Sequence, residues 1–276
     1  MLDIIICVKA VSDPETVAHY VVSGVGVHID EQNKKIIPEG IETVISPFDE
    51  LAAEAALRIK DKLGTGVTIM AISLGTEDGI KILRRVLAMG VDAAILLKDE
   101  AFEDANDMVT AHALAAAIRK IGAFDLILCG RQAADVDSGV IGSGLSELLG
   151  VPSVTLAKDV QVQGHVAQVE RSTPEEIEKI EMHLPALVTV SSELGEPRFP
   201  KMKGMLAAKR KEIPVWNAQD LGLDRELITE QSERLKLEKI SVVEMRGQCE
   251  FVEGESPDEI AAMLIQKLQE ERILQR

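Results

Sequence analysis

The first two-thirds of the chain alternate short apolar runs with longer amphipathic segments, and this alternation limits the possible fold more than any other feature. The apolar runs predict buried strands at 3–8, 67–75, 93–98 and 124–130. The amphipathic segments predict helices at 46–64, 77–90, 106–122 and 138–150. Continuous apolar strands joined by helices of this length are typical of a parallel sheet covered on both faces. We therefore predict an α/β fold with an open, mostly parallel sheet.

The remaining segments predict additions to this sheet. Period-two alternation at 153–173 predicts an antiparallel hairpin, a smaller hairpin is expected around Asn33, and a further short strand is expected at 184–192. Residues 213–276 are charged and lose strand patterning, apart from an amphipathic helix at 257–275. We expect a nucleotide-binding domain at 1–212 and an arm at 213–276 that packs on a partner, because the arm cannot build its own core.

Composition excludes several classes of function. The chain has 276 residues and a net charge of −16, which argues against nucleic-acid binding, as does an aromatic content of only 3%. We expect no membrane insertion, because no apolar stretch is long enough to cross a bilayer. The first ten residues contain an acid instead of a basic region, so no signal peptide is expected. Three scattered cysteines favour the reducing cytoplasm.

Three strand ends are candidates for a ligand site, because ligands of open parallel sheets bind beyond the carboxyl ends of the strands. These ends read "CVK" at 7–9, "SLG" at 73–75 and "CGRQAADVDSG" at 129–139. In the third, Ser138 is a candidate helix cap, and the glycines at 139, 142 and 144 permit close approach of the backbone to a ligand. Spacing alone leaves two interpretations open, a nucleotide site and an ordinary tight turn.

Other signals favour structural interpretations. The five histidines show no metal-ligand spacing, no nucleophile-elbow motif is present, and Cys7 and Cys129 are expected to be inert core residues. The segment 199–208, "FPKMKGMLAA", places methionines between prolines and lysines. Two interpretations remain open for it, core packing and a patch that docks a partner.

Several motifs together resemble the β subunit of electron transfer flavoproteins over nearly the whole chain. They are "CVK", "SPFDELAAEAALRIKD", "LAMGVD", "DLILCGRQAADVDSG", "LPALVTV" and "GEPRFPKM", in the family's order and spacing. The resemblance implies a fold of the adenine-nucleotide α-hydrolase-like type, paired with an α subunit of similar architecture. It also implies electron transfer between a flavin dehydrogenase, such as an acyl-CoA dehydrogenase, and an acceptor.

The resemblance further implies cofactors and contact residues. An FAD is held mainly by the α subunit, and the β subunit holds AMP or, in electron-bifurcating members, a second FAD. The implied nucleotide contacts are Cys7, Ser46, Pro47, Phe48, Asp49, Leu74, Gly130, Arg131, Gln132, Ala133, Ala134, Asp135, Val136, Asp137, Ser138, Gly139, Val140 and Ile141. Met202 falls at the family's partner-recognition position, with Met205 and Leu206 beside it.

The two acids of the third strand end need an explanation, because a phosphate would be repelled by nearby carboxylates. We expect Asp135 and Asp137 to shape the loop while backbone amides face the phosphate. The residues 139–141, "GVI", match neither the AMP-binding nor the bifurcating subgroup, so AMP and FAD both stay open. The alternative function is an ATP- or AMP-binding regulatory or stress-type protein of the same fold without a flavin.

Overall fold

The computed structural model describes residues 1–16, 27–30, 32–38, 40–103, 105–241 and 249–274. Its contacts divide the chain into two units, Met1–Lys239 and Ile240–Arg276. In the second unit, one helix, α8 (Pro257–Glu270), begins at Ser256, whose side chain accepts a hydrogen bond from the N–H of Glu259. None of the described helices is both long enough and apolar enough to cross a membrane.

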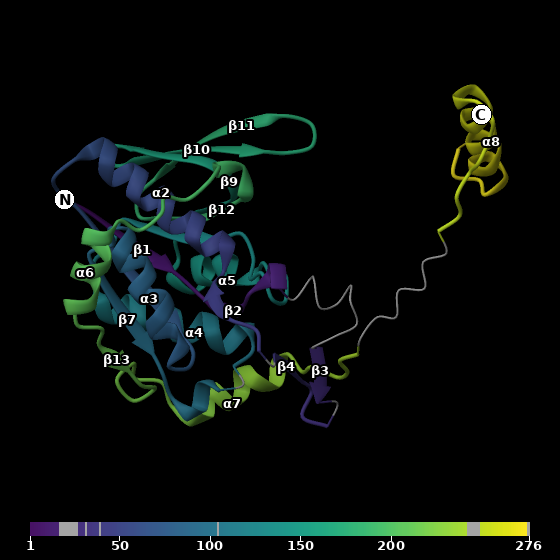
Figure 1. The fold of residues 1–276 in the computed structure, drawn as a ribbon. Coiled ribbons are helices and arrows are strands. Elements are labelled where there is room, and N and C mark those ends of the chain that lie inside the picture. The colour runs from purple at the N-terminus through teal and green to yellow at the C-terminus, as the bar shows by residue number, and fades with distance from the viewer. Residues whose placement is uncertain (17–26, 31, 39, 104, 242–248, 275–276) are drawn as a thin grey trace. The chain divides into compact units, whose positions relative to one another are not determined.

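The first unit is built on a nine-stranded sheet (Figure 1). Its strands, from one edge to the other, are β11 (Ile177–His183), β10 (Val166–Ser172), β9 (Ser153–Gln163), β12 (Ala186–Val190), β8 (Leu126–Gly130), β1 (Leu2–Cys7), β6 (Val67–Leu74), β7 (Ala93–Leu97) and β13 (Val215–Trp216). Only the pairs that involve β10 are antiparallel. The predicted open, mostly parallel sheet with an added hairpin is confirmed.

Two small antiparallel sheets lie outside the main one. One pairs β2 (Ala10–Ser12) with β5 (Thr43–Ile45), and the other pairs β3 (Val27–Asp30) with β4 (Lys35–Pro38). The second is the hairpin expected around Asn33. Its turn is held by Asp30, whose carboxylate accepts hydrogen bonds from Gln32 and Asn33.

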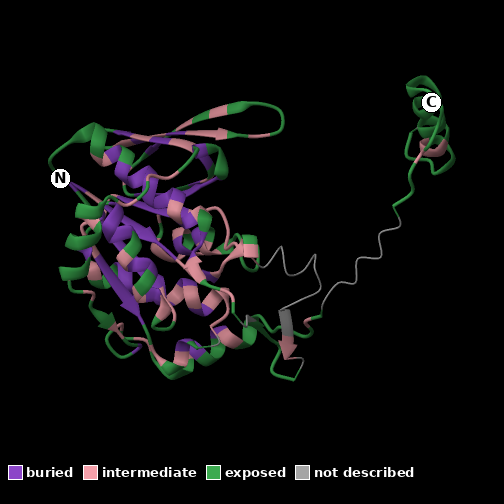
Figure 2. Cartoon of the chain, in the orientation of Figure 1, coloured by how far each residue is buried: buried purple, intermediate pink, exposed green. Residues whose placement is uncertain are grey.

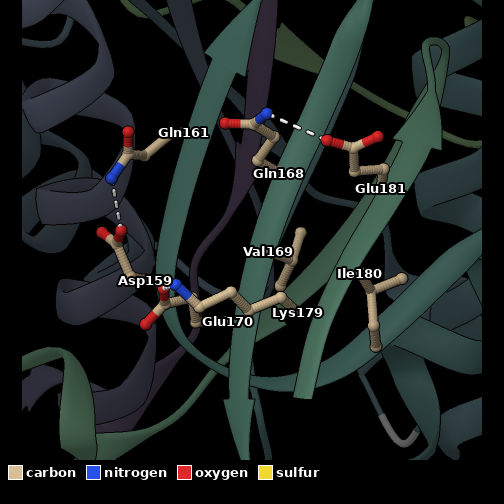
Figure 3. Close-up of a pocket in the computed structure, with 8 residues that line it drawn as sticks. All are labelled: Asp159, Gln161, Gln168, Val169, Glu170, Lys179, Ile180 and Glu181. Carbon is tan, nitrogen blue, oxygen red and sulfur yellow. Dashed lines mark hydrogen bonds and ion pairs between the residues drawn. The ribbon is translucent and has the colours of Figure 1, made fainter. Parts of the chain in front are cut away.

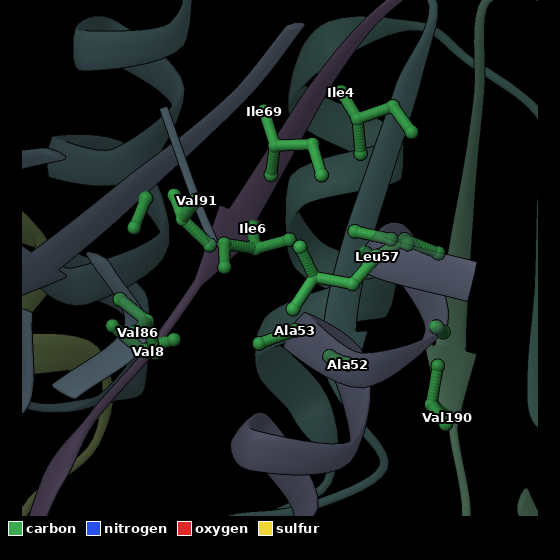
Figure 4. Packing of buried hydrophobic residues seen from close by; sticks show 14 of the residues in the cluster. Ile4, Ile6, Val8, Ala52, Ala53, Leu57, Ile69, Val86, Val91 and Val190 are labelled. Atoms are coloured by element: carbon green, nitrogen blue, oxygen red, sulfur yellow. The ribbon is translucent and has the colours of Figure 1, made fainter. Parts of the chain in front are cut away.

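Helices cover both faces of the sheet, as the continuous apolar strands require. One face packs against α2 (Pro47–Leu63) and α3 (Asp78–Met89), and the other against α4 (Asp107–Ile121), α5 (Val140–Leu149) and α7 (Arg225–Arg234). Figure 4 shows the first of these cores, where Ile4 and Ile6 meet Leu57 of α2. Figure 2 shows that the buried residues follow the central strands and the inner faces of these helices. Two 3₁₀ helices, η1 (Glu100–Phe102) and η2 (Ser192–Leu194), complete the connections.

The strand order reverses direction next to β1. The chain proceeds from β1 to β6 and β7 on one side, then crosses to β8 on the other side of β1. Crossovers on opposite sides leave a crevice at the carboxyl ends of the two strands where the direction changes. This crevice lies beyond β1 and β8, which end at Cys7 and Gly130.

The first unit extends beyond the predicted domain boundary at 212. Strand β13 pairs with β7, and Ile228 of α7 is buried against the core on the α4 side. Asn106 ties α7 in place, because its side-chain amide donates to the carbonyls of Gln231, Ser232 and Leu235. Strand β13 has only two residues, too few to show a periodic pattern of apolar residues, so the sequence did not predict it. Residues 213–239 therefore belong to the first unit.

The residues that precede α4 and α2 differ in how they cap their helices. Asn106 caps α4, accepting from the N–H of Val109 at 3.0 Å. Ser46 precedes α2 but makes no side-chain cap, and its buried hydroxyl has no partner in the described residues. Pro47 starts α2 by its restricted backbone, and Asp49 and Glu50 follow in the first turn.

Candidate functional site

A cavity of about 320 Å³ occupies the crevice where the strand order reverses. The carboxyl ends of β1, β6 and β8 line it together with the beginnings of α4 and α5. The volume lies within the range of about 300–1,000 Å³ that is typical of small-molecule sites. The three strand ends singled out from the sequence thus meet at one cavity.

The structure places ten of the eighteen predicted contact residues on the cavity wall. These are Cys7, Asp49, Leu74, Gly130, Arg131, Gln132, Ala133, Ser138, Gly139 and Ile141. The other eight, Ser46, Pro47, Phe48, Ala134, Asp135, Val136, Asp137 and Val140, are not among the lining residues. Phe48 acts on the cavity through Arg131, because the Arg131 guanidinium carbon lies 5.1 Å from the centre of the Phe48 ring.

Sequence reasoning missed several residues of the cavity wall. Thr76 follows the end of β6, Phe102 lies in the connection between β7 and α4, and Asp107 and Thr110 lie in the first turn of α4. The signal was present for Asp107 and Thr110. A helix that follows a parallel strand begins at the same edge of the sheet where that strand ends, so the beginning of α4 had to face the crevice.

Asp49 is a buried carboxylate that joins two strand ends beneath the cavity. Its Oδ2 accepts the N–H of Lys9 at 2.9 Å, and its Oδ1 accepts the N–H of Gly130 at 3.0 Å. Only 8% of the residue is exposed. Burial raises its pKa to about 7 from the ordinary 3.8, although the two N–H groups favour the charged form. A substantial fraction of Asp49 is therefore uncharged at neutral pH.

The loop between β8 and α5 closes on itself through backbone hydrogen bonds. The N–H of Ala133 donates to Ser138 O at 3.0 Å, and the N–H of Asp137 donates to Ala133 O at 2.8 Å. Asp137 has a φ of +52°, a left-handed conformation that aspartate tolerates better than most residues. Its carboxylate accepts the side-chain amide of Gln132 at 2.6 Å. Asp137 thus shapes the loop.

The other acid of this loop is neutralised by a cation from a different strand end. The ammonium group of Lys9 lies 2.8 Å from Asp135 Oδ2 and 2.9 Å from Oδ1. Ser138 was expected to cap α5, but its hydroxyl donates to Asp107 of α4 at 2.6 Å, and the N-cap of α5 is Gly139 without a side-chain cap. The first turn of α5 therefore keeps N–H groups without a side-chain acceptor, as an anion site requires.

The three glycines of this region serve different purposes. Gly142 lets α5 approach β12, because a Cβ there would lie 2.4 Å from the Thr189 side chain. Gly139 lies on the cavity wall with an ordinary φ of −105°. Gly144 is not among the residues that line the cavity, and an added Cβ there would lie 3.4 Å from Ala111 of α4. The expectation that all three approach a ligand is therefore wrong for Gly144.

A second candidate surface is the exposed face of α6 (Met202–Arg210). Met202 is 70% exposed and Leu206 56%, with Met205 beside them, and Phe199 just before the helix is 83% exposed. The core-packing interpretation of this segment is therefore wrong. Four neighbouring apolar side chains on the surface, with Lys201 and Lys203 among them, are typical of a docking site.

The opposite face of α6 is fixed tightly to the body of the unit. Gly204 crosses α3 so closely that an added Cβ would lie 2.2 Å from the carbonyl oxygen of Ala88. Arg84 of α3 donates to the carbonyls of Ala208 and Lys211 at the end of α6. This packing places the exposed methionines on a rigid support.

A buried ion pair fixes the segment that leads into α6. Glu54 of α2 accepts Arg198 Nε at 2.8 Å, Arg198 N at 3.1 Å and Arg58 Nε at 2.9 Å. Burial alone would raise the pKa of Glu54, but the hydrogen bonds from Arg198 and Arg58 lower it below the ordinary value. Glu54 stays charged and holds Arg198 in one position.

Another hollow, of about 350 Å³, lies on the extension formed by β9, β10 and β11 (Figure 3). Its polar side chains bind one another across the strands. Gln168 donates to Glu181 at 3.0 Å, and Lys179 pairs with Glu170 at 2.9 Å. Because these groups satisfy one another, we assign no ligand to this surface.

The family model and the relatives found by comparison with known proteins all belong to the same family. The sequence pattern described as "Electron transfer flavoprotein domain" matches residues 34–221. The chain is 34% identical over 273 residues to the electron transfer flavoprotein subunit beta of Clostridium acetobutylicum, covering 99% of this chain and all of that one. It is also 34% identical, over 98% of this chain and 99% of the relative, to the caffeyl-CoA reductase-Etf complex subunit CarD of Acetobacterium woodii. A subunit beta from Thermoanaerobacterium thermosaccharolyticum is 41% identical over 72% of this chain and 76% of its own length.

Proposed function

Because this chain belongs to the electron transfer flavoprotein family as a β subunit, we propose that it forms a heterodimer with an α subunit and relays electrons between a flavin dehydrogenase and an acceptor. The α subunit holds an FAD, which supplies the one- and two-electron chemistry when bound. The observation that carries the proposal is the joint presence of a cavity at the strand-order reversal and a rigidly supported apolar helix face in one unit. Three free cysteines fit a cytoplasmic location.

We assign an adenine nucleotide to the cavity, either AMP or the AMP half of a second FAD. The phosphate faces the first turn of α5, where N–H groups lack a side-chain cap. Two nearby acids do not oppose it, because Lys9 neutralises Asp135 and burial keeps much of Asp49 uncharged. A cavity near the lower end of the usual range for ligand sites suits the AMP group.

We assign dehydrogenase recognition to the exposed face of α6. Met202 and Leu206 offer adaptable apolar contacts that become buried on docking, and such anchors carry most of the binding energy of an interface. The lysines around them suit an acidic partner surface. Gly204 and Arg198 keep this surface in one orientation, so little ordering is needed when the partner docks.

We assign contact with the α subunit to the second unit, residues 240–276. Its helix α8 buries none of its residues within the described chain. Ile260, Met263, Leu264 and Ile265 are exposed on it. A helix with such a surface is stable only when a partner covers it.

The test is to co-express the chain with its α subunit and analyse the purified heterodimer. We expect a flavin absorption spectrum, and acid release followed by chromatography should yield FAD with AMP, or FAD alone at two per heterodimer. A protein without flavin that releases ATP or AMP would refute electron transfer and support the regulatory function instead. AMP and a second FAD are distinguished by the same chromatogram, and the second FAD would indicate electron bifurcation.

A further inference from the structure

Two cysteines lie side by side on neighbouring central strands. The register pairs Ile6 of β1 with Leu128 of β8, so the next residues along, Cys7 and Cys129, are also neighbours. Both side chains belong to the core on the α4 side of the sheet, which places them on the same face. The two thiols are therefore adjacent on one face of the sheet.

Within the described residues, the pair faces the cavity at the strand ends. Cys7 is 6% and Cys129 4% exposed, and both are among the residues that line the cavity at the strand ends. Elsewhere they pack among buried apolar side chains such as Ile5, Ile127 and Leu114. A small reagent must therefore enter through the cavity to reach either sulfur.

We infer that Cys7 and Cys129 are a redox-active dithiol, which a hydroperoxide oxidises to a disulfide across the bottom of the cavity. One thiol attacks the O–O bond of the peroxide and becomes a sulfenic acid, and the peroxide leaves as an alcohol, or as water in the case of hydrogen peroxide. The second thiol then displaces the hydroxyl group as water, which forms the S–S bond. The two thiols lose two electrons and two protons, and the peroxide gains them.

The strand geometry permits this bond and makes it reversible. Paired residues of neighbouring strands lie about 4.8 Å apart, inside the interval of about 4.4–6.8 Å that separates the Cα atoms of bridged cysteines. Side chains of adjacent strands stand beside each other and do not point at each other, so the bridge is strained. Strained disulfides are the easily reduced ones. The neighbouring Cys7 thiol and burial raise the pKa of Cys129, so oxidation is slow.

A bound nucleotide would shield the pair, because it would fill the cavity that both cysteines line. This part of the inference rests on the proposed nucleotide site. The disulfide itself does not, since it requires only the two thiols and an open cavity. Loss of nucleotide would thus expose the dithiol, and the disulfide would form mainly in heterodimers without bound nucleotide.

The test uses the heterodimer in a Cys249→Ser background, because Cys249 is exposed and would form bridges between molecules. Protein stripped of nucleotide with charcoal is treated with hydrogen peroxide, alkylated and digested without reduction. We expect a cross-linked pair of peptides that carry Cys7 and Cys129, which dithiothreitol separates. Absence of this cross-link, with the thiols unmodified or singly oxidised to sulfinic acid, would overturn the inference.

A matched variant, Cys129→Ala, removes the partner thiol while leaving Cys7 in place. Its Cys7 should be oxidised to sulfenic and sulfinic acid without any cross-link, and dithiothreitol should no longer restore the full thiol content. A cross-link from Cys7 to a cysteine of the α subunit in this variant would contradict the assigned pairing.

A final arm adds AMP to the stripped heterodimer before the peroxide. At a concentration of ten times its Kd, AMP should slow cross-linking roughly tenfold, because only about one cavity in eleven stays open. An unchanged rate despite measured AMP binding would refute the shielding. If neither AMP nor FAD binds, the proposed nucleotide site fails, whereas the cross-link still decides the dithiol.

Discussion

Replacing Asp49 with asparagine should change how the stability of the protein depends on pH. Asp49 is uncharged in the folded state up to a pKa of about 7, whereas in the unfolded chain it ionises near 3.8. Between these pH values the folded protein binds the extra proton, so stability falls as the pH rises. The difference of about three pH units, at about 1.4 kcal/mol each, amounts to roughly 4 kcal/mol.

The Asp49→Asn variant carries no titrating group at this position. It also loses one hydrogen bond, because its amide nitrogen cannot accept the N–H of Lys9 or Gly130, at a cost of about 1–3 kcal/mol at every pH. The wild-type protein should therefore be the more stable of the two at pH 5. This advantage should shrink by roughly 3 kcal/mol between pH 5 and pH 8, as the pH rises through the folded pKa, and stay constant above that.

Urea unfolding of both proteins at pH 5, 6, 7 and 8 measures this difference. Infrared spectroscopy provides a direct check, since the carbonyl band of a protonated carboxyl group should be present at pH 6, absent at pH 8.5, and absent from the variant at either pH. A wild-type advantage that grows between pH 5 and pH 7 would show an ordinary, ionised Asp49 and refute the reasoning.

Four other perturbations test the proposed sites. Gly142→Val should empty the cavity of nucleotide, because its side chain would collide with Thr189; full occupancy by acid release and chromatography would contradict the packing. Asp137→Asn should keep most of the bound nucleotide, since asparagine accepts the left-handed conformation and the hydrogen bond from Gln132. Met202→Ala should slow reduction by the dehydrogenase through the loss of an anchor worth about 1–2 kcal/mol, with unchanged flavin content; equal rates would remove Met202 from the interface. Truncation after Lys239 should abolish co-purification with the α subunit, which a stable truncated heterodimer would disprove.

The central sheet could be predicted from the sequence because burial on both faces leaves a local pattern. Every residue of β1 and β8 that faces a helix must be apolar. In the helices between the strands, apolar residues recur with the helical period, because one side of each helix packs on the sheet. Strand β13 and helix α7 left no such pattern. Their place depends on contacts with β7 and Asn106, and the contact between Asn106 and Gln231 spans 125 residues of the chain.

The site could be predicted only in outline. The strand ends identified the crevice, but the partners of its acids could not be read from local sequence. Asp135 is neutralised by Lys9, and Asp49 bridges Lys9 and Gly130, through contacts that cross 126, 40 and 81 residues of chain. The sequence left both core packing and exposure open for Met202, because the choice depends on the placement of Gly204 against α3.

Helix α2 carries both Asp49, beneath the cavity, and Glu54, which holds Arg198 at the entrance to α6. Each added or deleted residue would rotate the rest of a helix by about 100° and shift it by about 1.5 Å. No insertion between these two acids can therefore keep both groups in place. Over evolutionary time, residues of the ligand cavity and of the docking surface can be substituted independently. The spacing of five residues between Asp49 and Glu54, however, has to be conserved.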